Sequence, residues 1–268
     1  MKILFLSHLG YRAQGDRRYC DEDIWLTERL RPGFDLAICH PVDAVRLMDD
    51  FDGVVIRNIG AVIDYQREYD EFRAAAISRN VRVYPQPTGK ADMIGKQYLL
   101  TMTASGDPVI PTYSDLTSLP DADEYVVKPK QGADSIGLRK VDRETLATVE
   151  LDGMLVQPLI DFQYEVSFYF INHDFEYALY APDPDRRWQL QRYEPTAADL
   201  DFARHFVEWN DIDHGIQRVD ACRTRDGRLL LVELEDLNPY LSLDMLDEAT
   251  RDGFVDRLAG SLRNYYLN

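Results

Sequence analysis

The sequence predicts two fold classes in one chain, an α/β unit followed by α+β subdomains. Short apolar runs alternate with helical stretches over residues 1–85, which is the pattern of a parallel sheet covered by helices. Pro85, Pro87 and Gly89 then mark a linker. In the C-terminal part, apolar and polar residues alternate with a period of two, as in antiparallel strands with one buried face.

The N-terminal unit is predicted to bind ligands at the carboxyl ends of its strands, as parallel sheets do. Arg57 and Asn58 lie at such an end and are candidate substrate contacts, with a solvated strand end as the alternative. Arg12, Arg17 and Arg18 follow the first strand and can bind an acid, although we favour a solvated loop. The predicted strands are residues 2–7, 35–40, 53–58 and 81–85, and the predicted helices are residues 21–31, 42–50 and 64–80.

The rest of the chain is predicted to contain two further subdomains. Lys96 lies on a predicted helix, and Thr196 with Asp199 gives a capping-box-like start to another. A turn at Gly227 joins two strands into a hairpin. The predicted strands are residues 109–113, 124–130, 137–141, 154–160, 165–172, 175–182, 188–195, 215–224 and 228–236, and the helices are residues 91–104, from 142, 196–210 and 246–265. We divide the chain into domains of residues 1–87, 88–157 and 158–268.

The composition excludes several classes of partner. The net charge of −17 repels the phosphate backbone of a nucleic acid, while a small polyanion can still bind where local cations reverse the sign. No apolar run is long enough for a membrane span, and the apolar N-terminus is too short for a signal peptide. Cys20, Cys39 and Cys222 form no paired motif, so we expect free thiols and a cytoplasmic location.

A glycine-containing turn follows the predicted strand at residues 124–130. Gly132 and Gly137 have the spacing of a phosphate loop, but the Lys that should follow is missing, and Lys128 stands ahead of the glycines. Small residues such as Ser135 let backbone N–H groups approach phosphate oxygens. Because a strand follows, the segment is predicted to be a β-hairpin lid, and a plain turn is the alternative.

Three carboxylates are predicted to share one face of the hairpin about Gly227. Glu233 and Glu235 are two residues apart on one strand, and the turn places Asp220 opposite them. Carboxylates so close repel one another unless a cation lies between them, and Mg²⁺ prefers such oxygen ligands. The alternative is an amphipathic strand whose two Glu side chains face water.

A third cluster surrounds a bend in the chain at Pro158. Gln157, Leu159 and Ile160 suit a hinge that gives an adenine ring an apolar slot and backbone hydrogen bonds. Glu165 begins the next strand and can accept hydrogen bonds from ribose hydroxyls.

The order of these clusters resembles the ATP-grasp superfamily over roughly residues 90–245, in the branch with glutathione synthetase, ribosomal-protein glutamate ligases and cycloserine-forming cyclo-ligases. The resemblance implies an N-terminal α/β (pre-ATP-grasp) domain and two α+β subdomains enclosing ATP. It implies phosphate-binding Lys96 and Lys128, a lid from Gly132 to Gly137, an adenine hinge at Gln157, Leu159 and Ile160, a ribose contact at Glu165, a metal triad of Asp220, Glu233 and Glu235, and catalytic Arg187 and Arg218. The candidate substrate residues are Arg57, Asn58, Arg192 and Asn238, and Asn238 is also an alternative for the third metal position, where relatives often have Asn.

The same resemblance implies an ATP-dependent carboxylate–amine ligase that acts through an acyl phosphate on a small amino acid or peptide. The carboxylate and the amine can also belong to the same molecule, in which case the reaction is a cyclisation. ATP and Mg²⁺ are the implied cofactors, with two metal ions and Mn²⁺ as a possible substitute, in a monomer or homodimer. Two alternatives stay open: a nucleotide-binding sensor or scaffold without ligase activity, and a small-molecule kinase.

The metal triad gives a first prediction. Glu233→Gln should nearly abolish turnover while the protein stays folded, because losing one well-placed electrostatic group costs about 2.7–4 kcal/mol of transition-state stabilisation. The measurement is ADP release under Mg²⁺, with circular dichroism as the control for folding. Turnover close to that of the wild type would remove Glu233 from the metal site.

Overall fold

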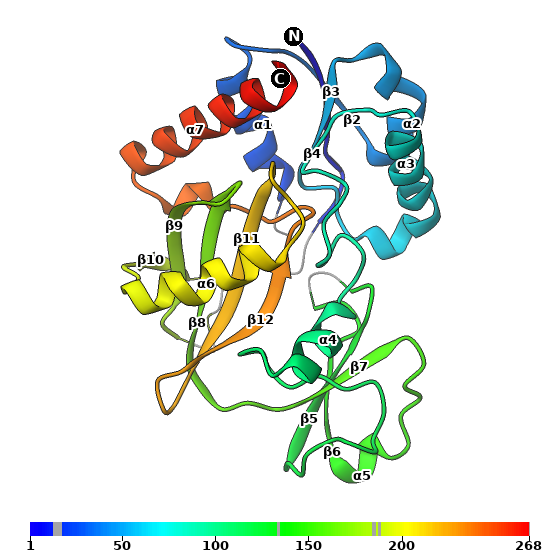
Figure 1. Ribbon diagram of the computed structural model, residues 1–268, viewed down its shortest axis with the longest axis vertical. Coiled ribbons are helices and arrows are strands. Elements are labelled where there is room, and N and C mark those ends of the chain that lie inside the picture. The colour runs from blue at the N-terminus through cyan, green and yellow to red at the C-terminus, as the bar shows by residue number, and fades with distance from the viewer. Residues whose placement is uncertain (13–17, 133–134, 184–185, 187–188, 268) are drawn as a thin grey trace.

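The computed structural model describes residues 1–12, 18–132, 135–183, 186 and 189–267 of the chain (Figure 1). These residues form three sheets, of four, five and three strands. A helix long and apolar enough to cross a membrane is not found among them.

The N-terminal sheet is parallel, as the sequence predicts, with strand order β2-β1-β3-β4. Side chains alternate between its faces. Ile3, Phe5 and Val55 pack in one core with α1 and α7, whereas Leu4 and Val54 pack in another core with α2 and α3. The elements are β1 (Lys2–Leu6), β2 (Asp35–Cys39), β3 (Gly53–Ile56), β4 (Val83–Tyr84), α1 (Cys20–Leu30), α2 (Ala44–Leu47), α3 (Gln66–Ser78) and α7 (Glu248–Leu267).

The predicted helix at residues 42–50 is divided into three short pieces. A 3₁₀ turn at Pro41–Asp43 precedes α2, and a second at Met48–Asp50 follows it. The backbone becomes extended at Phe51, with a φ of −120° and a ψ of 154°, so the helical segment ends there. A further 3₁₀ turn, Val62–Tyr65, precedes α3.

The five-stranded sheet has the order β10-β9-β8-β11-β12 and is antiparallel throughout. Helix α6 (Ala197–Trp209) lies across one face of it, in yellow in Figure 1, and begins with the predicted capping box of Thr196 and Asp199. The opposite face contributes Tyr169 and Tyr177 to the core that also holds α7 and the parallel sheet. The strands are β8 (Phe162–Ile171), β9 (Asp174–Ala181), β10 (Gln191–Tyr193), β11 (Ile216–Thr224) and β12 (Leu229–Glu235).

The three-stranded sheet has the order β6-β5-β7 and its own small core around Tyr125 and Val127. Strands β5 and β6 pair antiparallel, which confirms that a hairpin and not a helix follows the glycine-containing turn. The elements are β5 (Glu124–Pro129), β6 (Arg139–Asp142), β7 (Met154–Pro158) and α5 (Arg143–Leu146), whereas α4 (Tyr98–Ser105) packs into the core of the five-stranded sheet.

Two sequence predictions in the central region are wrong. The helix expected over residues 91–104 begins only at Tyr98, because Gly95 has a φ of 100°, which no right-handed helix contains. The strand expected at residues 109–113 forms only isolated bridges at Val109 and Tyr113. Pro111 lies between them and has no N–H to continue a ladder.

The burial of α6 against the five-stranded sheet gives a stability prediction. Phe206 is fully buried there, while its neighbour Phe202 is only partly buried, with ring centroids 5.0 Å apart. Phe206→Ala should lower the free energy of unfolding by about 3–5 kcal/mol, since it leaves a cavity. Phe202→Ala is the matched control and should cost clearly less in urea denaturation. Equal losses would contradict this packing.

Candidate active site

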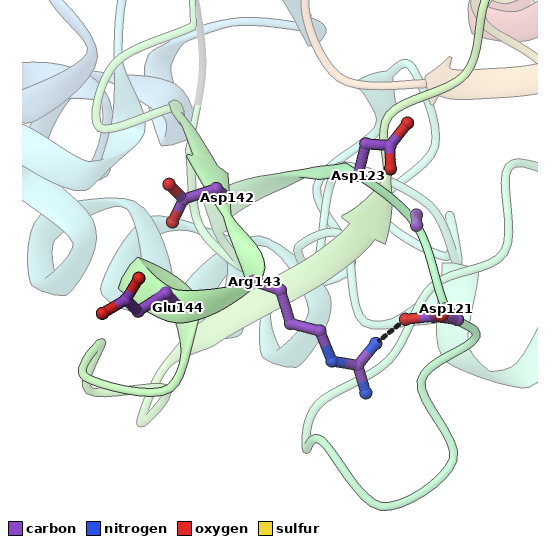
Figure 2. A pocket seen from close by; sticks show the side chains of 6 residues that line it. Asp121, Asp123, Asp142, Arg143 and Glu144 are labelled. Carbon is purple, nitrogen blue, oxygen red and sulfur yellow. Dashed lines mark hydrogen bonds and ion pairs between the residues drawn. The ribbon is translucent and has the colours of Figure 1, made fainter.

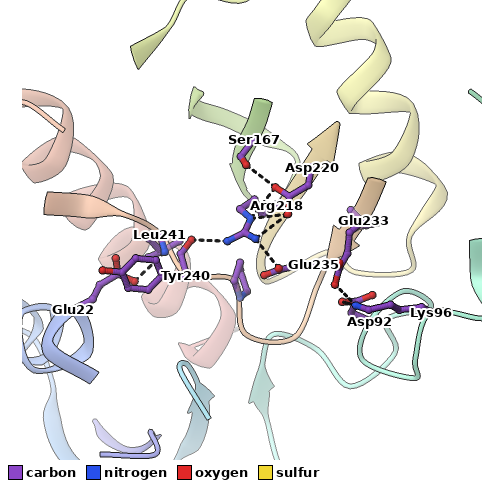
Figure 3. Close-up of polar contacts among 12 residues, drawn as sticks. Glu22, Asp92, Lys96, Ser167, Arg218, Asp220, Glu233, Glu235, Tyr240 and Leu241 are labelled. Carbon is purple, nitrogen blue, oxygen red and sulfur yellow. Dashed lines mark hydrogen bonds and ion pairs between the residues drawn. The ribbon is translucent and has the colours of Figure 1, made fainter. Parts of the chain in front are cut away.

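Strands β11 and β12 place the predicted acidic residues opposite one another. Asp220 pairs with Glu233 and Arg218 with Glu235 in the antiparallel register. Facing residues in such a pair project to the same side of the sheet, so the predicted common face is confirmed (Figure 3). Ser167, opposite Asp220 on β8, donates a hydrogen bond of 2.6 Å to its Oδ1 atom.

Arg218 lies between two of these carboxylates. Its Nη2 atom is 2.8 Å from Asp220 Oδ2 and 2.6 Å from Glu235 Oε1, and its Nη1 atom donates to the Tyr240 carbonyl at 2.8 Å. Burial raises the pKa of Glu235 to about 8, although the guanidinium opposes the shift. The pKa of Arg218 is itself raised, because Asp220 and Glu235 outweigh the effect of burial.

Glu233, on the same face, has a different cationic partner, Lys96. The Lys96 ammonium donates to Glu233 Oε1 and, at 2.7 Å, to Asp92 Oδ2 (Figure 3). Burial opposes ionisation of Glu233, but the charge of Lys96 outweighs it and lowers the pKa of Glu233. The pKa of Asp92 is raised well above its ordinary value by burial and then by the charge of Glu233. Two carboxylates therefore share one ammonium group.

The predicted metal triad is thus divided between two cations. Within the part of the chain that the structure describes, no three His, Cys, Asp or Glu side chains are arranged around one point as metal ligands. The donor chemistry nevertheless fits Mg²⁺, because Asp220, Glu233 and Glu235 all offer carboxylate oxygens on one face. A divalent ion there would compete with Lys96 and Arg218 for these oxygens.

A small cleft lies beside the Lys96 cluster. It opens between the loop after β3, the turn before α4, and the base of the β5–β6 hairpin. Its lining includes Gly60, Gln66, Tyr69, Asp92, Lys96, Lys130, Gly132 and Asn238.

A larger hollow lies beside β5, β6 and α5, in the three-stranded subdomain (Figure 2). Asp121, Asp123, Asp142 and Glu144 line it with Arg143, whose guanidinium pairs with Asp121, so the carboxylates outnumber the cations there (Figure 2). Such a surface repels a polyanion. We therefore place the candidate site at the smaller cleft and the adjoining β11–β12 face.

Known structures share this whole architecture. The structure of the D-cycloserine synthetase DcsG matches with a TM-score of 0.76 at 20% identity, covering 99% of this chain and 100% of that one. The D-alanine–D-alanine ligase from Bacillus anthracis complexed with ATP matches at 0.63 and 14% identity, covering 100% and 97%. The ATP-grasp ligase PsnB complexed with a phosphomimetic variant of its minimal precursor, Mg and ADP matches at 0.61 and 15% identity, covering 97% and 96%.

The chain has the ATP-grasp fold. The likeness extends over nearly the full length of these proteins, including the N-terminal parallel sheet. No family model matches the sequence, and the comparison with curated proteins found no match either.

In this ATP-grasp fold, Lys128 lies on β5 at the start of the hairpin and is buried, which lowers its pKa. The Lys96 N–H donates to the Lys130 carbonyl at 2.7 Å, so the base of the hairpin is tied to the turn that carries Lys96. Ser135 and Gly137 both have positive φ, at 59° and 74°, in the turn itself. Gly132 lines the cleft, while the predicted catalytic Arg187 and lid residues 133–134 lie outside the described residues.

The predicted adenine hinge joins the three-stranded sheet to the five-stranded one. Gln157 is buried on β7 and donates to Thr112 Oγ1 at 2.8 Å. Leu159 donates its N–H to the Glu124 carbonyl, and Ile160 precedes β8, on which Glu165 lies. The position between two sheets is that expected of a hinge in the fold.

The four candidate substrate residues lie in different surroundings. Arg57 is 2% exposed and donates to Glu22 Oε1 at 3.0 Å and to the Pro239 carbonyl at 2.9 Å. Asn58 is also buried and donates to Asp23 Oδ1 at 2.9 Å. Arg192 is exposed and donates to Thr250 Oγ1, and Asn238 lines the cleft. The structure thus brings only Asn238 to the cleft wall.

Sequence reasoning missed Asp92 and Lys130. Asp92 and Lys96 are four residues apart, a spacing that brings side chains together in a helical turn, and this was the available signal. Lys130 lines the cleft together with Gly132, two residues later, so its place at the base of the predicted hairpin was the available signal.

The Glu22–Arg57 contact gives a pH prediction. Burial raises the pKa of Glu22 from its ordinary value of 4.5 to about 7. Between these values the folded protein keeps a proton that the unfolded chain loses, so this residue lowers stability as pH rises. Relative to the wild type, Glu22→Gln should therefore gain about 3 kcal/mol between pH 4 and pH 8 in urea denaturation. Glu28→Gln, at an exposed position of the same helix, is the control. A constant difference for Glu22→Gln would contradict the shift.

Proposed function

We propose that the protein is an ATP-dependent ligase that joins a carboxylate and an amine through an acyl phosphate. The observation that carries the proposal is the pair of buried lysines, Lys96 in the turn before α4 and Lys128 on β5, beside the carboxylate face of β11 and β12. Buried ammonium groups need anionic partners. A phosphate tail beside a carboxylate-held divalent ion has the required charge.

The proposed reaction has two steps. The γ-phosphoryl group passes from ATP to the carboxylate and ADP leaves; the amine nitrogen then bonds to the carbonyl carbon, the C–O bond to phosphate breaks, and the nitrogen loses a proton. Phosphoryl transfer needs positioning and charge neutralisation more than covalent help from the protein. Lys96 and Lys128, together with Arg187, would neutralise phosphate oxygens, and Arg218 would lie near the phosphate or the substrate.

The remaining roles follow from position in the fold. Mg²⁺ held by Asp220, Glu233 and Glu235 would supply charge neutralisation at the phosphates. Gln157, Leu159 and Ile160 would contact adenine, and Glu165 the ribose. Structures of this fold hold ATP in the Bacillus anthracis ligase and Mg with ADP in PsnB, which supports nucleotide and metal use.

The decisive experiment is a screen of amino acids and dipeptides for ADP release with Mg²⁺. Substrate-dependent ADP release that produces an amide supports the ligase, and hydroxylamine trapping of a hydroxamate supports the acyl phosphate. ADP release that yields a stable phosphorylated alcohol would instead identify a kinase. Nucleotide binding without ADP release for any substrate would favour a sensor or scaffold.

Lys128 gives a quantitative test of nucleotide binding. Lys128→Met should weaken a non-hydrolysable ATP analogue with Mg²⁺ by roughly 10–100-fold, because a hydrogen bond to a charged group contributes about 1.5–3 kcal/mol. Calorimetric titration measures it. Lys140→Met, on the exposed strand β6 of the same hairpin, should bind as the wild type does. Unchanged affinity of the Lys128 variant would remove it from the phosphate site.

A further inference from the structure

The cleft beside Lys96 is built from segments that are fixed to one another. Asp236, directly after β12, is fully buried and accepts hydrogen bonds from the Met93 N–H at 2.7 Å and the Ala91 N–H at 3.1 Å. These bonds hold the turn containing Asp92 against the end of the strand that carries Glu233. The cleft wall beside the candidate site therefore has a defined position.

Two acceptor oxygens in this wall lack hydrogen-bond partners. Among the described residues, Asp92 Oδ1 and Gln66 Oε1 are both buried and unpaired, and both side chains line the cleft. The side-chain amide donors nearby are engaged: Gln66 Nε2 with Asp70, Gln131 Nε2 with the Ile94 carbonyl, and Asn238 Nδ2 with the Gly60 carbonyl. A buried acceptor without a partner costs about 1–3 kcal/mol, so this wall calls for a ligand that donates hydrogen bonds.

The charge of the cluster points the same way. Asp92 and Glu233 share the single ammonium of Lys96, so two buried carboxyl groups have one cation between them. A nucleotide phosphate that also binds Lys96 would weaken the electrostatic attraction between Lys96 and the Asp92 carboxyl group. A ligand that is both cationic and a hydrogen-bond donor meets both needs, and a primary ammonium group has these properties.

We infer that this cleft binds the amine substrate, with its ammonium group held by Asp92 and Gln66, and that a bound nucleotide strengthens this binding. The inference rests on the proposed ligase function, because that function supplies the phosphate that competes for Lys96. The coupling is reciprocal: an amine that binds better with nucleotide also raises nucleotide affinity by the same factor.

The test is calorimetric titration of the full chain with glycine, D-alanine, L-alanine and ethanolamine, and with their N-acetyl derivatives. Each is titrated with and without a non-hydrolysable ATP analogue and Mg²⁺. At least one amine should bind tenfold more tightly with nucleotide, and its N-acetyl derivative tenfold more weakly. Asp92→Asn should weaken the amine at least tenfold more than the nucleotide. Asp201→Asn, on an exposed position of α6, should change neither.

Three outcomes decide the inference. Amine binding by Asp92→Asn at wild-type strength overturns it, and so does a nucleotide-loaded wild type that binds none of the amines. If the wild type does not bind the nucleotide, the proposed function is contradicted instead. The amine affinities of the wild type and of Asp92→Asn, measured without nucleotide, then test the amine site. Gln66→Leu, with the same expected loss of amine affinity, replaces Asp92→Asn if that variant does not fold.

Discussion

The compensation of buried charge on the β11–β12 face is the constraint on which the site depends. Arg218 lies among Asp220, Glu235 and the Tyr240 carbonyl, and Lys96 lies between Asp92 and Glu233. A buried charge without its partner is far more costly than a surface one. Each cation therefore fixes the carboxylates around it, and the strand register fixes the distance between the two groups.

The segment after β12 connects this face to other parts of the molecule through hydrogen bonds. Asp236 binds the turn that precedes α4, and Glu22 accepts the N–H groups of Leu241 and Leu243 while Arg57 donates to the Pro239 carbonyl. Residues 236–243 are thus bonded both to the central region and to the N-terminal domain. Arg57 contributes to the site by holding this segment in place.

The acidic composition and a local cluster of lysines are compatible because charge acts locally. The net charge of −17 is a property of the whole surface, whereas Lys96, Lys128 and Lys130 gather at one cleft and the hairpin base. The strongly acidic hollow beside β6 and α5 lies away from them. Such separation lets one chain carry a negative surface and a locally basic cluster together.

The sequence by itself determined the parallel N-terminal sheet, the hairpin after Lys128, and the register that places Asp220 opposite Glu233, because alternation, turns and strand pairing are short-range properties. The tertiary structure alone decided that Lys96 meets Glu233, 137 residues away, and that Arg57 is enclosed by Glu22 and Pro239. It also decided that the three acidic residues divide between two cations. These contacts depend on how separate sheets pack against one another, and local sequence patterns do not predict that packing.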